Sequence, residues 1–388
     1  MPAKKKPKIE EKHLQGFKYF KALGGIFDHL HEIGTERDHA GNRKLFFDHY
    51  AGLLLVYFFN PILTSIRGIQ QASGLNKVQR LSGCSRTSLG SLSEAVQIFD
   101  PEKLKEIVCE LAVRVLPTAD GAIAKALEGL TAVDGTLLPA LARMAWALWT
   151  DDKHRAAKMH LVFDVFRWTP VNVTVTQGNG SEKGQLRLLL ERGRLYVTDR
   201  GYAEYALFQE ILAAGSSFIC RIRENAVWNL VEERRLTLEA KAAGVQRDLV
   251  VWLGCEKSGA ALNQQIRLVE VATGKTNARG NPEVLLLATD RLDLSADLVA
   301  LGYKYRWTVE LFFRWFKCIL GCRHLLSHSQ KGVEIQAYVA LIATLLISIW
   351  TGQKPNKRTF EMIRFFFVGW ADEEEVLAHI AQREKHNQ

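Results

Sequence analysis

Residues 302–320, GYKYRWTVELFFRWFKCIL, have the pattern of an amphipathic helix with two chemically distinct faces. At roughly 100° per residue, four polar side chains of this stretch fall within about 60° of one another. They are Tyr303, Arg306, Glu310 and Lys317, and Arg314 joins the same face. The opposite side is apolar and holds Val309, Phe312, Phe313, Phe316 and Leu320. A solvated face usually carries mixed charges. A carboxylate surrounded by a phenol and cations instead indicates a metal ligand beside a nucleic-acid backbone.

Two aspartates on predicted strands complete this hypothesis. Asp134 lies in LTAVDGTLL, an apolar strand pattern in which an ionised carboxylate is costly unless something pairs with it. Asp199 lies in RLYVTDRGY, at the end of a short apolar strand and just before a helix. Open α/β sheets tend to bind ligands at the carboxyl ends of strands. Together with Glu310, these aspartates could hold two divalent cations about 4 Å apart, enough for phosphodiester hydrolysis and strand transfer.

Three motifs in order carry a family resemblance: VDGT, then TDRGY, then YxxRxxxExxxxxxK. Together they resemble the DDE transposases of bacterial insertion sequences, in the branch with the Tyr-Arg-Glu-Lys signature. The last motif is the specific one, because four residue types match at fixed spacing. The resemblance covers about residues 125–350, and the helical region before it is compatible with the same family.

The resemblance implies an α/β fold with an RNase H-like catalytic core. It also implies that Asp134, Asp199 and Glu310 are the catalytic residues and bind two Mg²⁺ ions, with Mn²⁺ as a substitute. The reaction would be cut-and-paste transposition through hairpin ends. The partners would be double-stranded DNA, as terminal inverted repeats and as target, and a second copy of the chain on that DNA, with no membrane.

The same resemblance assigns the remaining polar residues of the helix to DNA. Tyr303, Arg306 and Lys317 would grip the phosphates of the transposon end near the scissile bond. Arginine binds phosphate bidentately, lysine supplies a point charge, and tyrosine offers a hydrogen bond and a stacking face. Arg314 and Arg200, which follows Asp199, are further phosphate candidates.

Each aspartate also has a structural interpretation. Asp134 with Gly135 could form a bend, and Asp199 could cap the following helix. Asp164 and Asp290 are rivals for the second catalytic position, since ATDRL echoes VTDRGY. Asp164 falls mid-strand between apolar neighbours, and Asp290 stands too close to Glu310 to fit the order of the core. The motif match therefore favours Asp134, Asp199 and Glu310.

Composition favours a basic protein with an anionic partner. The 388 residues carry a formal net charge of +9, while 47% hydrophobic and 24% charged residues are ordinary for a globular protein. The cysteines are scattered and no signal peptide is visible, which predicts a reducing, cytoplasmic location. Two apolar runs, LFFDHYAGLLLVYFFNPIL and AYVALIATLLISIW, are predicted as buried helices instead of membrane spans.

The order of patterns predicts six regions. Residues 1–16 form a disordered basic tail, and residues 17–125 a helical N-terminal DNA-binding domain. The catalytic core occupies residues 126–225 and 293–350, interrupted by a β-rich insertion over residues 226–292. Residues 351–388 form a C-terminal helical region. Within the core, three strands are followed by helix, strand, helix and strand.

Three local features carry further predictions. QRLSGCSRTSLGSLSEAV resembles a helix-turn-helix, with Gly83 at the turn and Arg86, Thr87 and Ser88 starting the second helix. Plain helical packing is the alternative. The cysteines and histidines near the end of the amphipathic helix match no common zinc finger, so packing and surface roles are favoured over a metal site. They are Cys318, Cys322, His324 and His328.

The insertion is predicted to consist of strands: VWNLVEE, RRLTLEA, RDLVVWLG, QIRLVEVAT and EVLLLATD. Some members of the resembled branch carry a base-stacking aromatic at the start of the last strand, but NPEVLLLATD has none. Trp228 and Trp252 could stack a base, although their place in strands favours core packing.

Two other function classes fit the same residues. An RNase H-like nuclease that hydrolyses DNA without strand transfer would use the same three acids. A non-catalytic DNA-binding protein descended from a transposase would not need them, so the intact triad argues against it.

Overall fold

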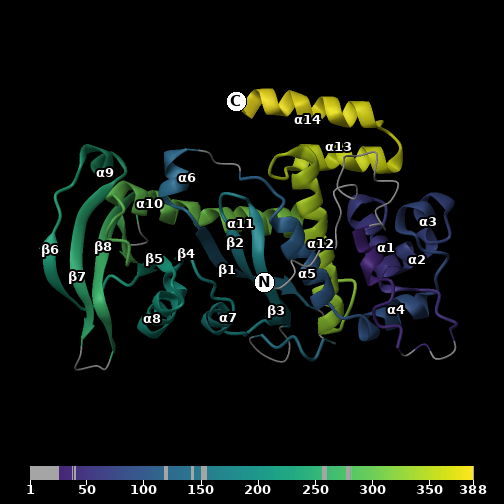
Figure 1. The fold of residues 1–388 in the computed structure, drawn as a ribbon, viewed down its shortest axis with the longest axis horizontal. Helices are drawn as coiled ribbons and strands as arrows, with labels where there is room; N and C mark the ends of the chain where they lie inside the picture. The colour runs from purple at the N-terminus through teal and green to yellow at the C-terminus, as the bar shows by residue number, and fades with distance from the viewer. Residues whose placement is uncertain are drawn as a thin grey trace, which may run out of the picture.

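One mixed sheet with helices on both sides forms the centre of the molecule (Figure 1). The computed structural model describes residues 26–36, 38, 41–117, 121–140, 144–149, 155–255, 260–276, 280 and 282–387. The predicted disordered tail, residues 1–16, lies outside these residues. Nine strands pair in the order β3-β2-β1-β4-β5-β9-β8-β7-β6. The fold class predicted from the sequence, α/β, is confirmed.

The first five strands build the half of the sheet that carries the two aspartates. Strands β1 to β3 form an antiparallel meander, and β4 and β5 run parallel to β1. Helix α7 lies between β3 and β4 in the chain, and α8 lies between β4 and β5. The predicted order of three strands, helix, strand, helix and strand is confirmed. The elements are β1 (Leu130–Pro139), β2 (Ala156–Asp164), β3 (Thr169–Gln177), α7 (Glu182–Leu188), β4 (Leu195–Thr198), α8 (Tyr205–Ala213) and β5 (Ser217–Ile222).

The predicted insertion continues this same sheet. Its last strand, β9, pairs antiparallel with β5, and the other three follow outward to the edge strand β6. The insertion's strands are β6 (Trp228–Glu233), β7 (Val245–Cys255), β8 (Ala260–Thr276) and β9 (Pro282–Thr289). Four of the five predicted strands are therefore confirmed.

The prediction of a strand over RRLTLEA, residues 234–240, is wrong. Its second half begins α9 (Leu238–Ala242). The Thr237 side chain accepts a hydrogen bond from the Ala240 amide and so caps the helix, while Gly244, at φ 84°, lets the chain leave it. Leu238 is 80% exposed, so the alternating leucines that suggested a strand do not share a buried face.

Helices form the part of the molecule before β1. They are α1 (Phe47–Phe59), α2 (Ile66–Ala72), α3 (Asn76–Ser82), α4 (Leu89–Ile98), α5 (Glu102–Ala112) and α6 (Ala122–Ala126). Of these, α1, α4 and α5 carry most of the buried apolar residues. Gly83 ends α3 with φ 69°, as the predicted helix pair requires. The start of its second helix was predicted too early. Ser88 is the N-cap of α4, accepting from the Ser91 amide, so Arg86 and Thr87 lie in the connection.

The C-terminal helices are α12 (Gln330–Thr351), α13 (Lys357–Val368) and α14 (Glu373–Asn387). Helix α12 contacts α1, α4, α5 and β3, and thus joins the N-terminal helices to the sheet (Figure 1). It is long and apolar enough to cross a membrane, but 89% of its apolar window is buried inside the fold. Helix α1 is also almost wholly buried. Both apolar runs are therefore buried helices, as predicted.

The predicted amphipathic helix, residues 302–320, is not one regular helix. Helix α10 (Ala296–Tyr305) ends at Arg306, α11 (Trp307–Arg314) begins there, and a π-helical turn (Trp315–Ile319) follows. The backbone remains in the right-handed helical region at Arg306, so the two faces persist. The predicted apolar side is confirmed as buried, because its five residues all join the main core.

Candidate active site

Asp134 stands in the middle of β1, on the side of the sheet that α11 covers. Ala132 and Leu138, an even number of residues away, belong to the main core, and α11 packs on β1. The Asp134 Oδ1 atom accepts a hydrogen bond from the Gly135 amide at 2.8 Å. The strand pairs in unbroken register with β2 through Asp134 and Gly135, so the bend interpretation is wrong. The other carboxylate oxygen, Oδ2, lies 3.7 Å from Arg306 Nη1.

Burial dominates the electrostatic environment of Asp134. Burial raises the pKa of its carboxyl group to about 6. The Gly135 hydrogen bond and the charge of Arg306 lower that pKa, and the charges of Asp199 and Glu182 raise it. Since a nearby cation favours the ionised form, this is a place where a bound cation would relieve an existing cost.

Asp199 lies beside Asp134 because of the strand register. Strands β1 and β4 are parallel, with Ala132 paired to Val197. Asp134 comes two residues later on β1, and Asp199 comes two residues later, directly after the end of β4. Two residues along a strand restore the same face of the sheet. Asp199 is also the N-cap of the short 3₁₀ helix Arg200–Tyr202, with its Oδ1 accepting from the Gly201 amide at 2.8 Å. The predicted cap is present, and it fixes the orientation of this side chain.

Glu310 approaches from α11 and is connected to Asp134 by Arg306. The Arg306 guanidinium donates from Nη2 to Glu310 Oε1 at 2.7 Å, and its Nη1 lies 3.7 Å from Asp134 Oδ2. The Arg306 side chain is only 15% exposed. Among the described residues, Asp134, Asp199 and Glu310 do not have ligand atoms all within 4.8 Å of one another. Arg306 thus occupies the space between two carboxylates that a cation would share.

The other predicted DNA-contacting residues surround this centre. Lys317 donates from Nζ to Thr136 Oγ1 at 2.8 Å, on the same face of β1 as Asp134. The Arg306 guanidinium carbon lies over the Tyr303 ring, 5.9 Å from the ring centroid. Arg200 and Arg314 are exposed. The structure therefore brings Tyr303, Arg306 and Lys317 to the acids.

Sequence reasoning missed two arginines of the same site. Arg221 and Arg223 stand at the end of β5 and line a cavity of about 370 Å³. The other lining residues are Asp199, Arg200, Gly201, Tyr303 and Arg306. The period-two spacing of CRIR at a strand end was the available signal, since alternate residues share a face.

The rival aspartates bind backbone amides elsewhere. Asp164 is paired with Thr131 at the opposite end of β1 from the site, and its Oδ1 accepts from the Arg167 amide at 2.9 Å. Asp290 accepts from the Phe218 amide, at the start of β5, at 2.8 Å. Both carboxylates lie at the end of the parallel strands away from Asp199.

Two further side-chain predictions have different outcomes. Cys318 is exposed and Cys322 is buried, and no metal-ligand group containing them occurs in the described part of the chain. Trp228 is half-buried against the smaller apolar cluster. The prediction of core packing is wrong for Trp252, which is 44% exposed because it points to the open face of the strand pair near the sheet edge.

Comparison with known proteins places these residues in a family. The model of the transposase DDE domain matches residues 125–346. Over 240 residues the chain is 30% identical to the putative transposase y4zB of Sinorhizobium fredii (strain NBRC 101917 / NGR234), covering 61% of this chain and 64% of that protein. Over 234 residues it is 24% identical to the probable transposase for insertion sequence element IS5377 of Geobacillus stearothermophilus, covering 58% and 59% of the two chains.

A similar solved structure is the cryo-EM structure of the piggyBac transposase synaptic complex with hairpin DNA. It has a TM-score of 0.46 and 11% sequence identity, and covers 96% of this chain and 83% of that chain. The chain spans less than two thirds of the length of both curated relatives. The transposase DDE domain model, however, takes in more than half of the 388 residues. The chain therefore belongs to the family of proteins with a transposase DDE domain.

Proposed function

We propose that this protein is the transposase of an insertion sequence and that Asp134, Asp199 and Glu310 are its catalytic residues. The observation that carries the proposal is the register of β1 and β4, which sets Asp134 and Asp199 side by side on one face. The helix that carries Glu310 packs against that face. The family, the element order and these three acids together favour an RNase H-like core of the Tyr-Arg-Glu-Lys branch.

The residues of the site fit divalent metal ions. All three candidate ligands are carboxylates, the donors that Mg²⁺ prefers, with Mn²⁺ as a substitute. Burial and neighbouring acids hold the pKa of Asp134 at about 6, so an ion would remove an electrostatic cost already present. When bound, two ions would activate the attacking oxygen and stabilise the leaving oxygen of an in-line displacement.

The protein's own residues would prepare the site for that chemistry. The Gly201 amide fixes one Asp199 oxygen, and the Gly135 amide fixes one Asp134 oxygen, so both carboxylates are oriented before anything binds. Glu310 is hydrogen-bonded to Arg306. We infer that Arg306 leaves Glu310 and turns to a DNA phosphate when the complex assembles, since phosphate offers the same bidentate geometry.

DNA would enter over a basic surface beside the acids. Arg221, Arg223 and Arg200 line the cavity next to Asp199, and Arg306 and Tyr303 close its other side. Lys317 stands beyond Asp134, where it reaches Thr136. Phosphates on both sides of the acids would thus meet cations, while the net charge of +9 favours approach of the duplex.

The reaction proposed is cut-and-paste transposition. Water attacks a phosphodiester at the transposon end and frees a 3′-hydroxyl. That hydroxyl attacks the opposite strand and forms a hairpin, which water reopens before the 3′-hydroxyl joins target DNA. Two ends must be held together, so a homodimer on terminal inverted repeats is proposed. Residues 126–225 and 293–350 would form the catalytic core around the insertion 226–292. Residues 17–125 would bind DNA, and residues 351–388 would form the C-terminal helical region.

The test uses end-labelled duplexes that carry the inverted repeats flanking the gene. The wild type in Mg²⁺ should nick them, form hairpins and join ends to a target plasmid. Cleavage without joining would favour an RNase H-like nuclease. Binding without cleavage by the wild type would favour a DNA-binding protein derived from a transposase.

A further inference from the structure

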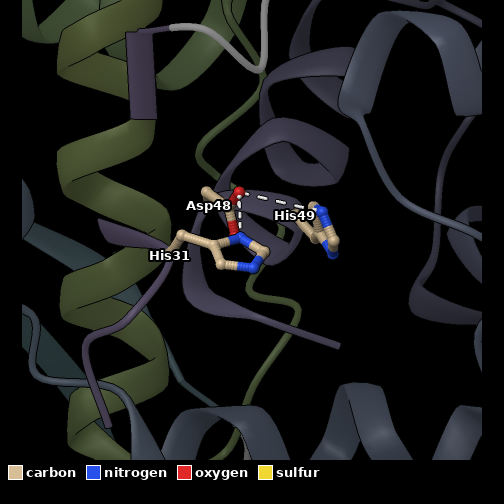
Figure 2. Close-up of side chains that lie close together, drawn as sticks. All are labelled: His31, Asp48 and His49. Carbon is tan, nitrogen blue, oxygen red and sulfur yellow. Dashed lines mark hydrogen bonds and ion pairs between the residues drawn. The ribbon is translucent and has the colours of Figure 1, made fainter. Parts of the chain in front are cut away.

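A compact histidine–aspartate cluster lies in the N-terminal helical region, away from the three acids (Figure 2). His31 follows a short 3₁₀ segment, residues 26–30, while Asp48 and His49 belong to the first turn of α1. His31 Nδ1 lies 2.8 Å from Asp48 Oδ2, and His49 Nε2 lies 3.7 Å from the same oxygen. Figure 2 shows both rings directed at the carboxylate between them.

The Asp48 Oδ1 atom of this cluster is buried without a hydrogen-bond partner among the described residues. The Asp48 side chain is only 10% exposed. A buried carboxylate normally has hydrogen bonds or cations at both oxygens, because its desolvation is otherwise uncompensated. Asp48 therefore stands in a setting that a metal ion would complete.

The spacing of the ligand atoms suits a small tetrahedral ion. Ligands about 2.0–2.1 Å from zinc lie about 3.4 Å from one another at tetrahedral angles. The two observed distances, 2.8 Å and 3.7 Å, lie on either side of that value. All three ligand atoms are within 4.8 Å of one another. Shifts of less than an ångström would bring these two distances to that value.

We propose that His31, Asp48 and His49 bind a divalent transition-metal ion, with Zn²⁺ as the expected occupant. Two imidazoles and one carboxylate are the donors of zinc sites, whereas Mg²⁺ prefers oxygen donors alone. Three protein ligands leave a fourth position open. The His31 side chain is 37% exposed, so an ion would reach the site from the side of His31.

The ion would fasten the start of the described chain to the N-terminal helices. His31 and Asp48 are 17 residues apart, so the ion closes a loop between the 3₁₀ segment and α1. The site also adjoins the connection between α3 and α4, because a Cβ atom added at Gly83 would stand 3.5 Å from His49 Cδ2. The ion would therefore stabilise the same helix pair for which the sequence predicts DNA binding.

The experiment measures thermal unfolding of the full chain with and without Zn²⁺, in excess Mg²⁺ to compete for the proposed carboxylate site. The wild type should unfold at a higher temperature with Zn²⁺, because a ligand that binds only the folded state stabilises it. His49→Gln and Asp48→Asn should each lower Zn²⁺ affinity by at least about tenfold, as losses around metal ligands do. His324→Gln is the matched control and should respond like the wild type.

Zn²⁺ responses of His49→Gln and Asp48→Asn equal to that of the wild type would overturn the proposal, as would a response lost only in His324→Gln. If a variant does not fold, Co²⁺ absorption of the wild type decides. Tetrahedral Co²⁺ bands that Zn²⁺ displaces and Mg²⁺ does not, retained in His324→Gln, would support the site. Absence of such bands from the wild type would contradict it.

Discussion

Arg306 donates a 2.7 Å hydrogen bond to Glu310 while its other terminal nitrogen lies 3.7 Å from Asp134. One guanidinium thus bridges two of the three carboxylates proposed to hold metal ions. A metal ion held by these carboxylates would compete with Arg306 for the same oxygens. This competition offers a way to link DNA to metal binding, because a phosphate that attracts Arg306 releases the glutamate.

Removing the competitor should strengthen metal binding in the absence of DNA. Arg306→Ala is expected to bind Mg²⁺ or Mn²⁺ roughly fivefold more tightly than the wild type, since an ion pair of about 1 kcal/mol no longer opposes binding. Calorimetric titration of the DNA-free protein measures this. Arg314→Ala is the control, because it removes the same charge from an exposed position of α11. Equal affinities in the two variants would mean that Arg306 does not restrain Glu310.

The same variant should fail later in the reaction. Arg306→Ala is expected to retain first-strand nicking and lose much of the hairpin step, because bending an end sharply is costly and phosphates beside the bend must be clamped. Denaturing gels of end-labelled DNA would show nicked product accumulating. Double-strand breaks by the wild type with no hairpin at any time would rule out the hairpin route. This control is necessary because NPEVLLLATD has no aromatic residue to stack on a base.

The raised pKa of Asp134 predicts a pH-dependent cost to stability. Its carboxyl pKa rises from 3.8 to about 6 on folding, so the cost is absent below pH 3.8, grows as pH rises to about 6, and is complete above. Without divalent metal at pH 7.5, Asp134→Asn should therefore be more stable than the wild type, by roughly 1 to 3 kcal/mol. Urea unfolding at pH 7.5 and pH 4 measures the difference, which should shrink at the lower pH. A variant less stable than the wild type at pH 7.5 would show that the charge is compensated.

The basic surface should contribute to DNA binding through counterion release. Lys317→Ala, Arg306→Ala and Arg221→Ala are each expected to reduce the slope of log affinity against log salt by about one. Fluorescence anisotropy over a salt series gives these slopes. Lys357→Ala provides the comparison, since Lys357 is 70% exposed on α13 and pairs with Glu361. Slopes unchanged in all of the first three variants would return this face to ordinary solvent contact.

Local patterns predicted what depends on local physics. The alternating apolar residues around Asp134 indicated β1, and the apolar half of GYKYRWTVELFFRWFKCIL indicated the buried side of α11. The prediction of a strand over RRLTLEA was wrong, because the Thr237 side chain caps a helix there. This single contact outweighs the alternation of leucines that is typical of a strand. These successes and this failure come from the same short-range information.

Contacts distant in sequence could not be read in the same way. The pairing of β9 with β5, which makes the insertion part of one sheet, depends on strands separated by the whole insertion. Arg221 lines the cavity beside Asp199 because β5 lies beside β4, and His31 meets Asp48 across a loop. The contacts of Arg306 with Glu310 and Asp134 depend on how α11 packs over β1. Spacing within a helix predicted which residues share its face, and only the fold shows what that face meets.

The most direct test of the account compares two aspartates that share a similar local sequence. Asp199→Asn and Asp290→Asn are assayed for cleavage of end-labelled inverted-repeat DNA in Mg²⁺, with binding measured in parallel. Asp199→Asn should lose cleavage by at least about a thousandfold while still binding the end, because a metal ligand supplies several kcal/mol to the transition state. Asp290→Asn, which alters hydrogen bonds to Ser217 and to the Phe218 amide at the start of β5, should cleave at close to the wild-type rate. Cleavage by Asp199→Asn at near the wild-type rate would contradict the assignment of the catalytic site.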